Sequence, residues 1–241
     1  MKRFLKPLLL AIIFLTLCIG YLLYDGYICL NSPEADKFPI AGIDVSAYQG
    51  NIEWDKVKSG GFKFAYIKAT EGKDFKDSNF AVNWESAKRA GIKRGAYHFF
   101  TFGSNGTEQA ENFMNAVPNE EDCLPPVIDV EFGGNSSKIP NKVLLQKELR
   151  NFIYQLESNY KRRPILYVTY DSYEKYIMGD FDDYTIWIRD IIQFPKIKDN
   201  RNWLFWQYNN RGRINGISTF VDINVFNGNE AELEKLLIKK I

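Results

Sequence analysis

The sequence of 241 residues contains one histidine, three cysteines and a net charge of only +1. With a single histidine, His98, the sequence argues against a histidine metal site and against a Ser-His-Asp triad. Three cysteines without a C-x-x-C pair cannot build a disulfide framework or a zinc ribbon. The balance of 31 basic and 30 acidic residues gives no basic field for nucleic acid, so no nucleic-acid partner is expected. Carboxylates remain as the residues most able to carry chemistry, and no metal or cofactor is expected.

The N-terminus is a separate unit. Residues 7–24 carry no charge, while Lys2, Arg3 and Lys6 precede them. Such a segment is a signal peptide or a single membrane-spanning anchor. We favour an uncleaved anchor, because the apolar run is longer than a usual signal core and no A-x-A-like site closes it. The predicted division is a signal anchor (or signal peptide) and linker at 1–37, and one barrel domain at 38–241 outside the cytoplasm. If the helix is cleaved, the domain is secreted.

The barrel prediction comes from the spacing of the β-rich segments. Their centres lie at Ile43, Tyr66, Tyr97, Ile128, Leu166, Trp187, Phe205 and Asp222. The first four gaps, of 23 to 38 residues, allow helical crossovers, whereas the last two, of 18 and 17 residues, barely do. Helical periodicity is visible around 80–87, 108–117, 141–156 and 231–238. We therefore expect an irregular TIM-like barrel of the α/β class. An open doubly wound sheet is the alternative, although no G-x-G-x-x-G follows the first strand.

Acidic residues interrupt strands that should be apolar. Asp44 lies in the first strand, Asp129 and Glu131 alternate in the fourth, and Asp222 lies in the last. Because side chains alternate along a strand, these acids share one face, which we expect to point inward. All four are expected late in their strands, at the open end of the barrel. Crowded, buried carboxyl groups repel one another, so at least one should stay protonated and could serve as a general acid.

Several motifs, in their order along the chain, resemble glycoside hydrolase family 25, the lysozymes of the Chalaropsis type. They are Gly42-Ile43-Asp44-Val45-Ser46 with Gln49-Gly50, Ile67 to Gly72, Gly95 to Phe99, Gln109-Ala110 with Phe113, Pro125 to Glu131, Trp206-Gln207-Tyr208, and Val221 to Asn224. The resemblance covers 40–226. One departure is the sixth strand, which ends in Arg189-Asp190 where the family more often has an aromatic residue.

The resemblance implies a (β/α)5(β)3 barrel. It also implies hydrolysis of the β-1,4 bond between N-acetylmuramic acid and N-acetylglucosamine in peptidoglycan glycan strands. On this resemblance Glu131 is the general acid/base, and Asp129 orients the acetamido group of the substrate. Asp44 and Asp222 are the other active-site acids. Direct attack by Asp129 stays open, because two positions along a strand separate Cα atoms by about 6.5 Å.

Four further side chains are candidate sugar contacts: Lys68, Tyr97, Tyr167 and Trp187. Each could equally pack in the core. His98 follows Tyr97 directly in its strand, so the two side chains point to opposite faces. This favours a structural hydrogen bond for His98. A non-catalytic carbohydrate-binding barrel and a chitinase-like glycosidase are the competing functions, although only the final D-x-E of a chitinase motif is present. A monomer is expected, joined to the membrane through the N-terminal helix.

Overall fold

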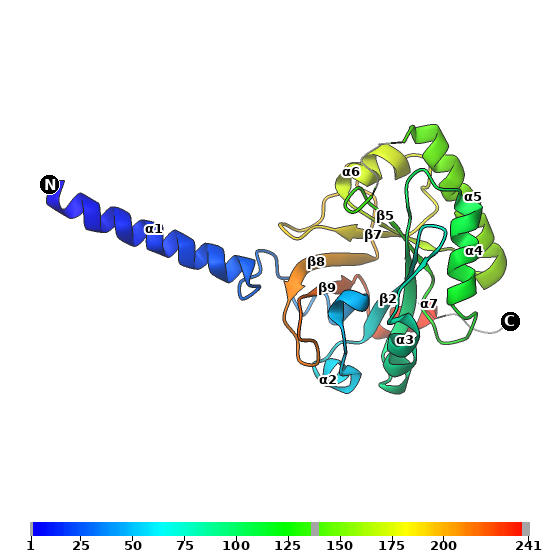
Figure 1. The fold of residues 1–241 in the computed structure, drawn as a ribbon, viewed down its shortest axis with the longest axis horizontal. Helices are drawn as coiled ribbons and strands as arrows, with labels where there is room; N and C mark the ends of the chain where they lie inside the picture. Colours follow the sequence, from blue (N-terminus) through cyan, green and yellow to red (C-terminus); the bar gives the residue numbers. More distant parts are fainter. Residues whose placement is uncertain (1, 136–139, 238–241) are drawn as a thin grey trace.

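The computed structural model describes residues 2–135 and 140–237 (Figure 1). The strands are β1 (Ile40–Val45), β2 (Phe64–Glu71), β3 (Phe75–Lys76), β4 (Lys93–Phe99), β5 (Val127–Val130), β6 (Ile165–Val168), β7 (Ile186–Arg189), β8 (Phe205–Gly212) and β9 (Val221–Phe226). The α-helices are α1 (Lys2–Tyr24), α2 (Trp54–Ser59), α3 (Phe80–Arg89), α4 (Gly106–Ala116), α5 (Lys142–Tyr160), α6 (Tyr170–Ser172) and α7 (Glu230–Leu236). A 3₁₀ turn, η1 (Ala47–Gln49), follows β1, and a π turn, η2 (Tyr173–Ile177), follows α6.

Eight of the strands close into a barrel. The order β1-β9-β8-β7-β6-β5-β4-β2 is completed by pairing between β1 and β2, and β3 forms only a short hairpin on β2. All eight predicted segments are barrel strands, so the prediction of an irregular TIM-like barrel is confirmed. Helical segments follow each of the first five barrel strands, and none separates β7, β8 and β9, which gives the (β/α)5(β)3 arrangement.

The last barrel strand runs against its neighbours. β9 is antiparallel to both β8 and β1, whereas the other neighbouring barrel strands are parallel. Asp222 is the second residue of β9, so the prediction that it lies late in its strand was wrong. The antiparallel direction of β9 nevertheless brings Asp222 to the predicted open end of the barrel, because β9 begins at the end where the parallel strands terminate.

Aromatic side chains fill the closed end of the barrel. The ring centroids of Phe64 on β2 and Phe205 on β8 lie 5.0 Å apart, and those of Tyr66 and Trp187 on β7 also lie 5.0 Å apart, across the interior. Two glycines make room for these rings. A Cβ on Gly42 would lie 2.4 Å from the Phe64 ring, and one on Gly95 would lie 2.2 Å from the Tyr66 ring. The interior is thus solid at one end, and any cavity has to lie at the other.

The outward faces of the strands pack against the helices. Ile43, Ile128 and Val130 alternate with the acids and are fully or almost fully buried in the outer core. On α5 the predicted face of Leu145, Leu149, Phe152, Ile153 and Leu156 is buried, and the predicted cap Asn141 accepts from the Val143 amide at 2.8 Å. The alternation therefore directs apolar side chains to the helices and polar ones inward.

Helix α1 projects away from the barrel (Figure 1). Its stretch Lys6–Tyr24 has a mean hydropathy of 2.3 and is not buried by the rest of the chain. Within the described residues this is the one helix long and apolar enough to span a membrane. Length and composition fit either a signal sequence or an anchor.

Candidate active site

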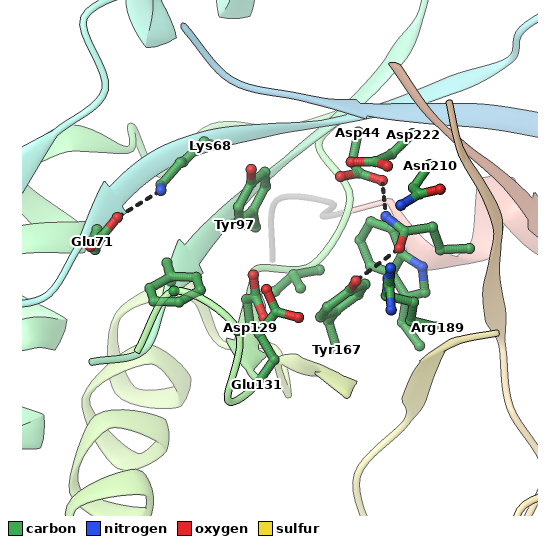
Figure 2. A pocket seen from close by; sticks show the side chains of 16 residues that line it. Asp44, Lys68, Glu71, Tyr97, Asp129, Glu131, Tyr167, Arg189, Asn210 and Asp222 are labelled. Atoms are coloured by element: carbon green, nitrogen blue, oxygen red, sulfur yellow. Dashed lines mark hydrogen bonds and ion pairs between the residues drawn. The ribbon is translucent and has the colours of Figure 1, made fainter. Parts of the chain in front are cut away.

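A cavity of about 560 Å³ opens at the end of the barrel where the parallel strands finish. We call it the cup. Its lining includes Asp44, Lys68, Glu71, Tyr97, Phe99, Asp129, Glu131, Tyr167, Trp187, Arg189, Gln207, Asn210 and Asp222. Figure 2 shows Asp44 beside Asp222 on one wall, and Asp129 with Glu131 on another. All eight side chains predicted as catalytic or sugar-binding therefore lie around one cavity.

Asp44 and Asp222 face each other across the β1–β9 ladder. They are register partners on neighbouring antiparallel strands, so their side chains leave the sheet on the same face. Burial raises the pKa of Asp222 well above its ordinary value, and the adjacent Asp44 raises it further. A protonated Asp222 can donate a hydrogen bond to the Asp44 carboxylate. The pair thus avoids placing two negative charges side by side.

Asp44 is also the centre of a polar network. Asn224 Nδ2 donates to Asp44 Oδ2 at 2.8 Å, and Gln207 Nε2 donates to the same oxygen at 3.1 Å. The amide oxygens of those two residues accept in turn, from Trp187 Nε1 at 3.0 Å and from Tyr167 Oη at 2.9 Å. Burial raises the pKa of Asp44, while these hydrogen bonds oppose the rise. The network holds one acid in a fixed orientation at the base of the cup.

Asp129 and Glu131 lie together on a second wall of the cup. Asp129 is 8% exposed, and its Oδ1 atom has no hydrogen-bond partner among the described residues. Burial raises the pKa of Asp129 well above its ordinary value, and Glu131 and Asp44 raise it further. Burial also raises the pKa of Glu131, against the opposing charge of Arg189. Burial and mutual repulsion therefore favour one shared proton over full ionisation of the pair, and Asp129 Oδ1 can accept a hydrogen bond.

Two cations lie on the wall of the cup. Lys68 Nζ pairs with Glu71 Oε2 at 2.8 Å and lies 5.2 Å from the centroid of the Phe99 ring. Arg189 ends β7 and lies beside Gln207 in the ladder. It lowers the pKa of Glu131, Asp44 and Asp222. The cup therefore combines five acidic residues with positive charge from Lys68 and Arg189.

The predicted sugar contacts differ in exposure. Tyr97 is partly exposed, whereas Tyr167 and Trp187 are 7% and 1% exposed and donate the hydrogen bonds described above. Their contact with a sugar stays a prediction. His98 is a structural residue, as its parity indicates. Its Nδ1 contacts Thr70 Oγ1 at 2.7 Å and its Nε2 contacts Gln109 Oε1 at 3.2 Å, and burial lowers its pKa to about 3.

Four polar residues that line the cup were not predicted as site residues from the sequence: Glu71, Arg189, Gln207 and Asn210. For Arg189 and Gln207 a signal existed. Arg189 lies two residues after Trp187, and Gln207 two after Phe205, so both share the inward face. In the part of the chain that the structure describes, no group of three or more His, Cys, Asp or Glu side chains is arranged to hold a metal ion.

A closed barrel whose open end gathers paired Asp and Glu side chains is the arrangement of a glycoside hydrolase. The family model described as "Glycosyl hydrolases family 25" matches residues 43–217, and the chain belongs to this family. The family resemblance predicted from the motifs is thereby confirmed.

Relatives and solved structures agree with this assignment. The chain is 38% identical to Lysozyme M1 of Streptomyces globisporus, over 83% of this chain and 71% of that protein. It is 35% identical to the uncharacterized protein YegX of Escherichia coli O157:H7, over 82% of this chain and 73% of that protein. A family 25 glycosyl hydrolase structure from Bacillus anthracis superposes with a TM-score of 0.81 at 44% identity, covering 84% of this chain and 95% of that one.

Proposed function

We propose that the protein is an N-acetylmuramidase that hydrolyses the β-1,4 bond between N-acetylmuramic acid and N-acetylglucosamine in peptidoglycan. The observation that carries this proposal is the Asp129–Glu131 pair in the cup. A buried Asp129 oxygen, unpartnered in the part of the chain that the structure describes, lies beside a carboxyl of raised pKa. Membership of family 25 and the 38% identity to a protein named as a lysozyme support it.

In the first step Glu131 donates its proton to the glycosidic oxygen as the bond to the anomeric carbon breaks. The 2-acetamido oxygen of the same sugar attacks that carbon and forms a cyclic oxazolinium ion. The acetamido N–H donates to Asp129 Oδ1, which has no hydrogen-bond partner within residues 2–135 and 140–237. This hydrogen bond favours the ionised form of Asp129, so the proton shared by the pair stays on Glu131 where it is needed.

In the second step water attacks the anomeric carbon from the side that the leaving sugar vacated. Glu131, now ionised, takes a proton from this water, and the oxazolinium ring opens to restore the acetamido group. Two displacements at one carbon retain the anomeric configuration. Ionised Asp44, held by Asn224 and Gln207, stabilises positive charge that develops nearby.

The decisive experiment incubates the purified protein with purified peptidoglycan and measures new reducing ends, followed by mass spectrometry of the reduced products. A muramidase leaves reduced N-acetylmuramic acid at the new ends, and NMR of the first product shows the β anomer. Reduced N-acetylglucosamine at the new ends, or an α anomer, would contradict the proposal.

Two alternatives give different results in the same assay. A non-catalytic carbohydrate-binding barrel would bind peptidoglycan without releasing fragments. A chitinase-like enzyme would release fragments from chitin and leave peptidoglycan intact. Both are less favoured, because the cup contains all four acids and the family match covers the strands that carry three of them.

The proposal places the barrel, residues 38–241, outside the cytoplasm as a monomer. Basic residues precede the apolar helix, so the N-terminus stays inside and the barrel is exported. The helix is retained as an anchor in this proposal. Mass spectrometry of the mature protein from membranes checks it, since removal of the helix lowers the mass by that segment.

A further inference from the structure

The segment that connects α1 to the barrel is attached to the end of the barrel that carries the cup. We call residues 24–31 the joining segment. Arg211 Nη1 donates to the Tyr24 carbonyl at 2.6 Å, and Arg213 Nε donates to the Asp25 carbonyl at 2.7 Å. Arg213 Nη2 also pairs with Asp25 Oδ1 at 2.8 Å. Arg211 is the penultimate residue of β8 and Arg213 directly follows the strand, at the end of the barrel where the cup opens. The C-terminal end of α1, at Tyr24, is therefore attached there.

A second attachment lies at the other end of the joining segment. Asn31 Nδ2 donates to the carbonyls of Asp190 at 3.2 Å and Gln193 at 2.6 Å. Asp190 directly follows Arg189, which lines the cup. Between the two attachments, Gly26 has φ +73° and approaches Arg211 so closely that a Cβ would lie 2.1 Å from its carbonyl oxygen. Two attachments and one close approach make the joining segment part of the folded barrel.

Exposed apolar side chains gather around this attachment. Tyr27, Ile28 and Leu30 of the joining segment, with Ile192 and Phe194 of the loop after β7, are between 42% and 68% exposed. We call these five residues the rim patch. Asn31, next to Leu30, donates to the carbonyl of Gln193, which lies between Ile192 and Phe194, and this contact brings the two parts of the rim patch together. Exposed apolar surface at the end of a spanning helix, with tyrosine among it, fits the interface of a lipid bilayer.

We propose that the joining segment and the rim patch hold the barrel against the outer face of the membrane that α1 spans, at the membrane–water interface. The open end of the cup then points toward the bilayer. For its substrate this inference rests on the proposed function. The enzyme then cleaves the glycan strands that lie nearest to the membrane. If residues 25–37 were instead an extended, unattached linker, the barrel could lie roughly 45 Å away from the membrane surface. Figure 1 shows α1 leaving the barrel from the end at which β8 finishes.

The orientation is measured on the full chain in liposomes, with no dependence on activity. A fluorophore is attached at Gln193→Cys, beside the rim patch, or at Glu121→Cys, an exposed position just before β5 at the closed end of the barrel. The native thiols are first replaced as Cys18→Ala, Cys29→Ser and Cys123→Ala. Phospholipid with a nitroxide headgroup quenches by proximity, and the rim label should be quenched at least about threefold more than the closed-end label.

Release of the joining segment should remove this difference. The test variant combines Arg211→Ala, Arg213→Ala and Asn31→Ala, because it then loses both attachments. Arg150→Ala with Arg163→Ala is the matched control, since these arginines also donate to carbonyls and lie over aromatic rings, elsewhere on the barrel. Equal quenching of the two labels in the parent, or quenching unchanged by release, would overturn the proposal. So would a mature protein from membranes that lacks α1.

Activity then tests the substrate separately from the orientation. In liposomes the parent should cleave a soluble glycan oligomer but attack added intact peptidoglycan poorly. The variant without both attachments should attack intact peptidoglycan faster, while its rate on the oligomer is unchanged. A parent that attacks both equally overturns the membrane-facing cup. No cleavage of the oligomer by any variant refutes the muramidase proposal instead, and leaves the quenching result to decide the orientation.

Discussion

Glu131→Gln keeps the shape of the side chain and removes its exchangeable carboxyl proton. Both proposed steps use that carboxyl group: it first protonates the leaving oxygen as an acid, and then, ionised, takes a proton from the attacking water as a base. General acid–base catalysis is worth about 10²–10⁴-fold, so kcat should fall by that factor, which corresponds to about 3–5 kcal/mol of activation free energy. KM should change little, because the amide can still accept and donate hydrogen bonds to the sugar.

The structure indicates that this variant will fold. Asn135 Nδ2 donates to the Glu131 carbonyl at 2.9 Å and to the Phe100 carbonyl at 3.0 Å, so the backbone here is held without the carboxyl group. The loss of a partly buried acid also removes repulsion with Asp129 and Asp44. The melting temperature should therefore stay the same or rise.

The assay follows reducing ends from purified peptidoglycan, with circular dichroism on the same preparations. Glu71→Gln is the matched control, because Glu71 lines the same cup but is paired with Lys68 and has no proton-transfer role here. It should lose less than about tenfold. Glu131→Gln with near-parental kcat and an intact fold would refute the reasoning, as would an equal loss in both variants.

Three further outcomes follow from the same site. Asp129→Asn should lower kcat on N-acetylated peptidoglycan by about 10²-fold, and the parent should barely cleave a de-N-acetylated glycan, which lacks the acetamido nucleophile that Asp129 orients; ready cleavage of that glycan would argue against this role. Arg189→Gln should move the alkaline limb of the pH–rate profile upward, because Arg189 lowers the pKa of the acid Glu131; a limb that stays or moves down contradicts the assignment. Burial raises the pKa of Asp129 in the native state above its pKa in the unfolded state. At a pH between these two pKa values the native state binds more protons than the unfolded state, so the free energy of unfolding should fall as the pH rises through this range. Thermal melts at several pH values should show a weaker fall in Asp129→Asn than in the parent.

The strands and their inward face could be predicted from the sequence because alternation is a local property. Asp129 and Glu131 lie between apolar neighbours, and the parity of that segment alone fixes which side chains point inward. The long helix after β5 was equally visible, since its cap and its apolar face recur with helical period.

The direction of β9 was not visible. A strand's own residues do not record whether its neighbour runs with it or against it, and only the short connection from β8 hints at a reversal. The roles of Arg189 and Gln207 were missed for a related reason. Each has a clear parity, but the charge it places beside Glu131 or Asp44 depends on the register between strands far apart in the sequence.

The docking of the joining segment was likewise beyond local patterns. Residues 25–37 read as a linker, because neither the arginines of β8 nor Asn31 carries a motif. Their contacts span 159 to 188 positions along the chain and arise only when the barrel is closed.

Closure of the barrel by its first and last strands also sets when the site can exist. Asp44 enters early in the chain, yet the amides that hold it, on Gln207 and Asn224, are 163 and 180 positions later. Asp222 arrives with the same final strand, and Leu233 of α7 then packs against the aromatic floor. A chain that lacks its last strand therefore has Asp44, Asp129 and Glu131 but no finished site, and on the proposed function hydrolysis begins only after the whole barrel has formed.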